Sequence, residues 1–161
     1  MESIIVNELR SFAKIMTGKQ KKFYLQMIKD AKVVEIASIF DVFTKDEIRE
    51  IKNGVKPKAK QCFKNASLLT KLFPDKDVKY VEGKYVVFRD GFSTDHAFNK
   101  VGDKYVDITA ELALGRSIEE INEREYIALC EVGLNELVES ELKSHVYGNV
   151  YVNNFINGLW T

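Results

Sequence analysis

The change of hydrophobic period along the chain constrains its fold more than any other feature of the sequence. Apolar residues recur three and four positions apart over residues 4–54 and again after residue 117, as expected of amphipathic helices. Over residues 78–108 the chain is instead rich in Val, Tyr and Phe, with turn residues at Gly91 and Gly102. Helices on both sides of a short run of strands predict an α+β domain.

Start and stop signals place the expected elements. The pairs Thr44 with Glu47 and Ser117 with Glu120 have the spacing of capping boxes, which begin helices. We expect helices over residues 4–16, 23–34, 45–53, 62–73, 118–130 and 134–142. We expect strands over residues 78–88, 96–101 and 104–108, with a turn at Arg89-Asp90-Gly91, and a short tail strand over 150–152 followed by a loop. The three central strands would form a small antiparallel meander.

Length and charge set the class of protein. The 161 residues are expected to form one domain, with a helical layer over 1–55, a catalytic-like core over 56–110, and C-terminal helices and a tail over 111–161. Lysine and arginine number 24 and the acids 24, which argues against nucleic acid as a partner. The sequence has no secretory signal pattern and no apolar run of ~18 residues, so we expect a cytoplasmic protein that does not bind membranes.

Cys62 is the candidate nucleophile. It follows Pro57 at the start of an expected helix, and the segment 51–74 contains six lysines and no acid. A helix N-terminus and nearby cations lower the pKa of a thiol and favour the reactive thiolate. Cys62 also shares a helix face with Ala66 and Leu69, so a small core residue is the alternative interpretation. Cys130, within an expected helix and beside acids, is interpreted as a core residue.

Only two histidines are present, and His96 has the better chemical neighbours. If the loop between the last two strands has two or four residues, His96 and Asp107 project from the same face of the sheet, and Asp107 can orient the imidazole. A three-residue loop would place them on opposite faces. His145 is expected at the surface or in tail packing. Cys62, His96 and Asp107 lack the close-spaced ligand pairs of a zinc site, and we expect neither metal nor cofactor.

The ordered set of motifs resembles the transglutaminase-like branch of the papain-like cysteine enzymes. The matching pieces are Cys-Phe-Lys-Asn-Ala at 62–66, Val-Lys-Tyr-Val-Glu-Gly at 78–83, His-Ala-Phe-Asn at 96–99 and Tyr-Val-Asp-Ile-Thr at 105–109. They lie within Gln61 to Thr109, under a third of the chain. The family often has tryptophan where this chain has Phe98, and glycine and tryptophan where it has Gln61 and Phe63.

This resemblance implies a papain-like fold, with a helical N-terminal layer, a nucleophile helix and a small antiparallel sheet. It also implies Cys62 as nucleophile, His96 as base and Asp107 as orienting residue. The backbone N–H of Cys62 is one expected oxyanion donor. The sequence does not show whether the side chain of Gln61 or that of Asn65 supplies the other.

The expected function is thiol-dependent acyl transfer or hydrolysis on an amide of a protein or peptide substrate. The alternative is a catalytically inactive papain-like fold that acts as a protein-binding or inhibitory module. Its contact surface would be the aromatic tail residues Tyr147, Tyr151, Phe155 and Trp160. A third interpretation is a structural domain in which the triad is incidental and Cys62 is unreactive.

Overall fold

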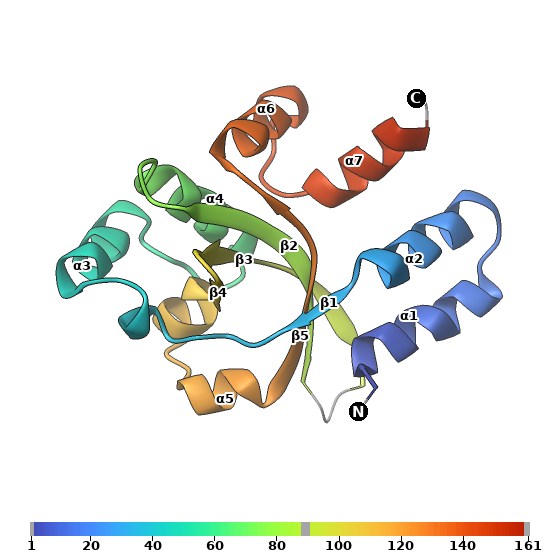
Figure 1. Cartoon of the computed structure of the whole chain (residues 1–161), viewed down its shortest axis with the longest axis horizontal. Helices are drawn as coiled ribbons and strands as arrows, with labels where there is room; N and C mark the ends of the chain where they lie inside the picture. Colours follow the sequence, from blue (N-terminus) through green and yellow to red (C-terminus); the bar gives the residue numbers. More distant parts are fainter. Residues whose placement is uncertain (1, 88–90, 160–161) are drawn as a thin grey trace.

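The computed structural model describes residues 2–87 and 91–159. Its centre is a curled antiparallel sheet with the strand order β1-β5-β2-β3-β4 (Figure 1). The strands are β1 (Lys32–Val34), β2 (Val78–Val87), β3 (Ser93–Val101), β4 (Lys104–Val106) and β5 (Arg124–Val132). The protein is therefore α+β, as the period change predicts, but its sheet is larger than a three-stranded meander.

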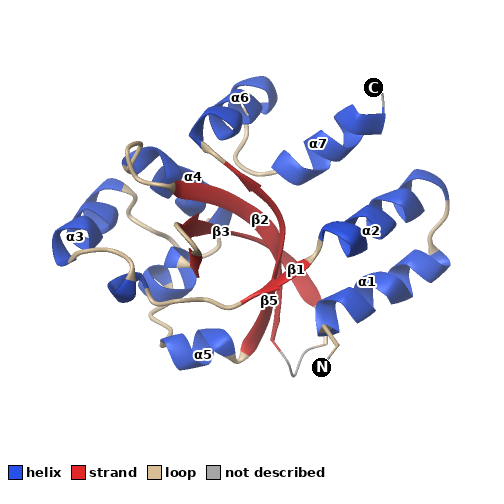
Figure 2. Ribbon diagram, in the orientation of Figure 1, coloured by secondary structure: helices blue, strands red, loops and turns tan. Residues whose placement is uncertain are grey.

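Helices surround this sheet (Figure 2). They are α1 (Ile4–Ile15), α2 (Gly18–Asp30), the 3₁₀ helix η1 (Ile39–Asp41), α3 (Lys45–Gly54), α4 (Cys62–Leu72), the π-helical turn η2 (Thr109–Ala113), α5 (Ile118–Asn122), α6 (Leu134–Ser144) and α7 (Val150–Leu159). The capping box of Thr44 and Glu47 at the start of α3 is confirmed. No helix in residues 2–87 and 91–159 is long and apolar enough to cross a membrane.

The expected helix over residues 118–130 is wrong in its second half. Helix α5 ends at Asn122, and the chain then forms β5, which lies between β1 and β2. Tyr126, Ile127 and Ala128 are consecutive and all buried. Because both faces of β5 are covered, its apolar residues do not alternate with polar ones, and the periodicity of a strand is lost from the sequence.

Two further elements differ from expectation. Val34 does not continue α2 but lies in β1, where it pairs with Tyr126 of β5. The tail is helical from Val150 onward, where a short strand and a loop were expected. The carboxylate of Glu82 on β2 accepts hydrogen bonds from the first two N–H groups of α7, at 3.1 and 2.9 Å. Glu82 lies 68 positions from Val150, so the sequence around the start of α7 does not indicate that this helix is capped.

The neighbouring strands β2 and β5 approach each other so closely at Gly83 that only glycine fits there. A Cβ atom on Gly83 would lie 1.8 Å from the carbonyl oxygen of Ile127, and the pairing of β2 with β5 shifts register between Glu82 and Gly83. At the far edge, the segment after β1 bridges to β4 through Ile36 and Tyr105. The sheet therefore curls around an apolar interior that includes Val81, Phe98 and Tyr126.

The sheet joins the three expected segments of the chain, since β1 comes from residues 1–55, β2 to β4 from 56–110, and β5 from 111–161. The aromatic tail divides between core and surface. Tyr151 is buried, and the ring of Phe155 lies 5.1 Å from that of Phe23, whereas Tyr147 is exposed. Trp160 and the expected turn residues Arg89 and Asp90 lie outside the described residues.

Candidate active site

Helix α4 begins at Cys62, as the sequence predicts. Its N-cap is Gln61, whose side chain makes no capping hydrogen bond, and Cys62 is half-buried. The first N–H groups of any α-helix have no acceptor within the helix. The N-terminus of α4 therefore presents backbone donors and the positive end of the helix dipole beside the thiol.

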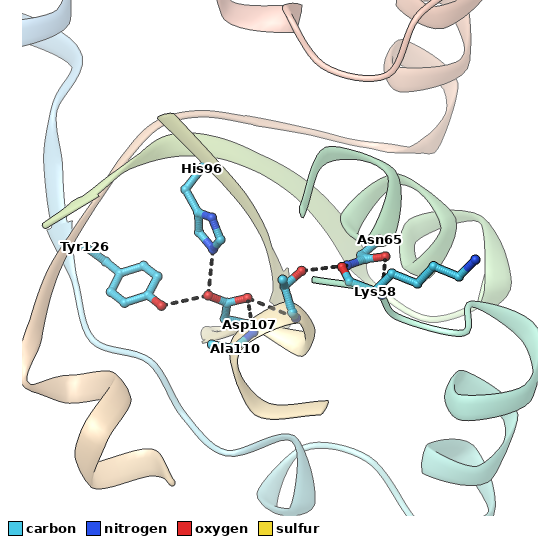
Figure 3. Close-up of polar contacts among 7 residues, drawn as sticks. Lys58, Asn65, His96, Asp107, Ala110 and Tyr126 are labelled. Atoms are coloured by element: carbon cyan, nitrogen blue, oxygen red, sulfur yellow. Dashed lines mark hydrogen bonds and ion pairs between the residues drawn. The ribbon is translucent and has the colours of Figure 1, made fainter. Parts of the chain in front are cut away.

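Asn65 fixes the chain on both sides of Cys62. Its Nδ2 donates to the Lys58 carbonyl and to the Thr109 hydroxyl, both at 2.8 Å, and its Oδ1 accepts from the Lys58 N–H at 3.2 Å (Figure 3). The side chain is buried and all three bonds are internal. Asn65 therefore holds the loop before Cys62 against the turn after Asp107, and its amide is not free to serve as an oxyanion donor.

Strands β3 and β4 bring His96 and Asp107 together. Asn99 pairs with Val106 and Val101 with Lys104, so the loop contains two residues, Gly102 and Asp103. Asp107 follows β4 directly, and its Oδ2 lies 2.7 Å from His96 Nε2. The same-face arrangement expected for a two-residue loop is confirmed, and the three-residue alternative is excluded.

Both carboxylate oxygens of Asp107 take part in hydrogen bonds. Its Oδ2 also accepts from the Tyr126 hydroxyl at 2.7 Å, and its Oδ1 accepts from the N–H groups of Thr109 and Ala110, each at 3.1 Å (Figure 3). Burial opposes its ionisation, but the charge of His96 and these hydrogen bonds prevail and hold the pKa of Asp107 below its ordinary value. The carboxylate is thus fixed in both position and charge.

The His96 ring is enclosed by aromatic side chains. The centroid of Tyr85 lies 4.6 Å from that of His96, and the centroid of Tyr126 lies 5.8 Å away, both edge-to-face. Burial alone would lower the pKa of His96, yet the negative charge of Asp107 and its hydrogen bond outweigh burial and raise the pKa to about 10. Cys62 contributes to the rise through hydrogen bonding and charge. Since Asp107 occupies Nε2, Nδ1 is the ring nitrogen left for the thiol.

The other candidate residues lie elsewhere. Cys130 is on β5 rather than in a helix, and it packs against the core, as expected of a structural cysteine. Burial, followed by the charge of Glu82, raises the pKa of its thiol to about 12. His145 is exposed at the C-terminus of α6. Within the described part of the chain, no group of three His, Cys, Asp or Glu side chains is arranged to hold a metal ion.

The lysines near Cys62 contribute less than their number implies. Those at positions 52, 56, 58, 60 and 64 are exposed, so water and salt screen their charge. Lys71 forms an ion pair with Glu141. The electrostatic environment of the site therefore comes mainly from the buried His96–Asp107 pair and the end of α4.

The sequence does not predict the contacts of two residues of the site. The sequence pattern predicts a helix at Tyr126, whereas only its position on β5 brings its hydroxyl to Asp107. Asn65 is an open candidate for the oxyanion donor in the sequence, and its actual partners, Lys58 and Thr109, are brought to it by the tertiary fold. The sequence carries no local signal for either contact.

No protein-family model, curated protein or solved structure matches this chain. The function must therefore be argued from the chemistry of the site.

Proposed function

We propose that the protein is a cysteine-dependent enzyme that transfers or hydrolyses an acyl group of an amide, with Cys62, His96 and Asp107 as nucleophile, acid–base and orienting residue. The observation that carries the proposal is the buried 2.7 Å contact of His96 Nε2 with Asp107 Oδ2, and the position of Cys62 at the N-terminus of α4 supports it. A nucleophile, a base and a residue that orients the base are the parts that acyl transfer requires.

In the proposed reaction, the Cys62 thiolate attacks the amide carbonyl, and the carbonyl oxygen becomes an oxyanion. Backbone N–H groups at the N-terminus of α4 stabilise that charge. The imidazolium of His96 then donates its Nδ1 proton to the leaving amine, the C–N bond breaks, and a thioester forms on Cys62. Neutral His96 next takes a proton from water or from a second amine, which attacks the thioester and releases Cys62.

Asp107 supports this cycle without exchanging a proton. It accepts from Nε2 throughout, which holds the ring with Nδ1 toward the thiol and stabilises the imidazolium form. The raised pKa of His96 fits a resting state in which the imidazole is protonated and can act as the acid of the first step. The substrate class in this proposal is a protein or peptide amide, and no cofactor takes part.

The order of nucleophile helix, histidine strand and aspartate strand also supports assigning the fold to the papain-like, transglutaminase-like class, as a proposal. The free cysteines are consistent with a cytoplasmic location.

A generic acyl donor tests the proposal without knowledge of the substrate. We expect p-nitrophenyl acetate to give a burst of nitrophenol and an acetyl group on Cys62, located by peptide mass spectrometry. Cys62→Ala should abolish both signals, whereas Cys130→Ala should retain them. Acetylation of Cys130 alone, or of neither cysteine in the folded protein, would contradict the proposal.

The second candidate function is a catalytically inactive protein-binding or inhibitory module. Exposed apolar side chains at Tyr147, Val152 and Ile156, 38–45% accessible, favour it. Absence of acetylation in the folded protein would favour this candidate.

A further inference from the structure

Tyr85 lies beside His96 because of its position on β2. Gly83 of β2 is paired with His96 of β3, and it has no side chain to place beside the imidazole. Side chains alternate between the two faces of a strand, so Tyr85, two positions after Gly83, projects from the same face as His96. An aromatic side chain reaches its diagonal neighbour on the adjacent strand. The ring centroids of Tyr85 and His96 are accordingly 4.6 Å apart, with the ring planes at 66°.

Tyr85 differs from the other two aromatic residues around His96. Phe98 and Tyr126 are 1% and 2% exposed, and their ring centroids lie 6.1 and 5.8 Å from that of His96. Tyr85 is closer, and it is half-buried. Within the described part of the chain its hydroxyl makes no hydrogen bond, and it is not one of the buried polar atoms that lack a partner. The hydroxyl therefore reaches solvent while the ring contacts the imidazole.

Tyr126 holds the ring of Tyr85 in place. The two residues are paired across β2 and β5, and their rings are stacked with centroids 5.6 Å apart and planes at 23°. The Tyr126 hydroxyl donates to Asp107, whose Oδ2 also contacts His96 Nε2. These contacts close a circuit of four side chains, and Tyr85 is the only one of the four that is not buried.

The hydrogen bond to Asp107 does not by itself fix the orientation of the imidazole. It fixes the position of His96 Nε2, but the ring can still tilt about that atom, which would move Nδ1 away from the thiol of Cys62. Side chains packed against the ring restrict this motion, and a catalytic group needs such support to stay in its productive geometry. Tyr85 is the aromatic ring nearest to the imidazole, and their separation is within the range of favourable edge-to-face pairs.

We propose that Tyr85 is a positioning residue of the active site, whose ring holds the imidazole of His96 so that Nδ1 stays directed toward Cys62. The hydroxyl of Tyr85 takes no part in this role. The proposal rests on the function proposed above, because it assigns a further residue to the same site.

Two substitutions separate the ring of Tyr85 from its hydroxyl. Tyr85→Phe removes only the hydroxyl, and we expect iodoacetamide to label Cys62 at the wild-type rate. Tyr85→Leu removes the ring, and we expect labelling about tenfold slower, because a small misplacement of a catalytic group lowers the rate steeply. The control is Phe73→Leu, which removes a half-buried ring from another part of the core and should label at the wild-type rate. Slow labelling of Tyr85→Phe, or wild-type labelling of a folded Tyr85→Leu, would overturn the proposal.

A second measurement distinguishes positioning from a general loss of stability. The ring N–H proton that His96 shares with Asp107 exchanges with water when the ring leaves the carboxylate, and NMR detects it only while exchange is slow. His145→Gln identifies the signal, since the chain has two histidines. We expect the signal in the wild-type protein, in Tyr85→Phe and in Phe73→Leu, and its loss in Tyr85→Leu. If Tyr85→Leu does not fold, Tyr85→Met removes the ring and keeps more of the side-chain volume. A signal that persists in the folded ring-deleted variant would contradict the proposal.

Labelling of Cys62 in the wild-type protein separates this proposal from the proposed function. A reactive Cys62 whose labelling and His96 signal are unaffected by loss of the Tyr85 ring leaves the enzyme proposal standing and refutes the role of Tyr85. An inert Cys62 refutes the enzyme proposal, and the His96 signal then still decides whether Tyr85 holds the imidazole.

Discussion

His96 Nε2 and Asp107 Oδ2 lie 2.7 Å apart inside the protein, although eleven positions separate the two residues in the sequence. The two-residue loop at Gly102 and Asp103 sets this relationship, because it fixes the pairing of β3 with β4. One additional loop residue would turn one of the two side chains to the opposite face. The geometry of the site thus depends on the register of a short hairpin.

This pair should make the stability of the protein depend on pH. The pKa of His96 rises on folding from 6.5 to about 10, so its contribution is complete below about pH 6.5 and is lost as the pH rises through about 10. The pKa of Asp107 falls on folding, so its contribution is present above pH 3.8 and is lost as the pH falls through its folded value. We predict that Asp107→Asn destabilises the protein most between about pH 4 and 6.5, and progressively less toward pH 10.

The measurement is the free energy of unfolding by urea at each pH for both proteins. Asp103→Asn, a change in the exposed turn of the same hairpin, is the control and should show no such trend. A destabilisation by Asp107→Asn that stays constant from pH 6 to 10 would contradict the coupling.

Tyr126→Phe should weaken the site without unfolding the protein. It removes the hydroxyl that donates to Asp107 Oδ2 and leaves the buried ring in place. We expect a loss of about 1.5–3 kcal/mol in stability, typical of a hydrogen bond to a charged group, and slower labelling of Cys62 by iodoacetamide. Tyr105→Phe removes a hydroxyl that donates to Glu131 and should lose stability without slowing labelling. Equal labelling rates in the two variants would argue against a positioning role for Tyr126.

Gly83→Ala should disrupt the centre of the sheet. The new Cβ would lie 1.8 Å from a backbone oxygen of β5, which cannot move without breaking strand pairing. We expect a loss of about 3 kcal/mol or more, measured by thermal or urea unfolding. Gly133→Ala is the control, since no atom lies within 4 Å of its Cβ position. Similar stability of both variants would show that the backbones of β2 and β5 have room for a side chain at Gly83, which would contradict this close approach.

Removal of the chain after Gly148 should destabilise the fold. Val150 is fully buried and Tyr151 is 8% exposed, and burial of each such side chain contributes about 1.5–3 kcal/mol. The truncation also leaves Glu82 without two of its donors. A truncated protein with unchanged unfolding midpoint would mean that α7 is a detachable surface, as the binding-module interpretation requires.

The sequence predicts the start of α4 and the β3–β4 hairpin better than it predicts the rest of the sheet. The start of α4 at Cys62 and the hairpin carrying His96 and Asp107 follow from local signals, namely a proline, a lysine-rich segment and a glycine turn. Strand β5 does not, because its burial on both faces removes the alternation that identifies a strand. The supporting contacts of Tyr126 and Asn65, and the cap that Glu82 gives to α7, join residues distant in sequence and leave no local pattern.

The pH dependence of alkylation at Cys62 and Cys130 in the folded protein tests the central claim most directly, because it reports thiolate reactivity at each cysteine without a substrate. We predict that Cys62 reacts rapidly well below pH ~8.5, where an ordinary thiol is mostly protonated. Cys130, with a pKa of about 12, should stay protected, and His96→Ala should move the Cys62 profile to higher pH. A Cys62 as inert as Cys130, or a Cys62 profile unchanged by His96→Ala, would contradict the proposed catalytic pair.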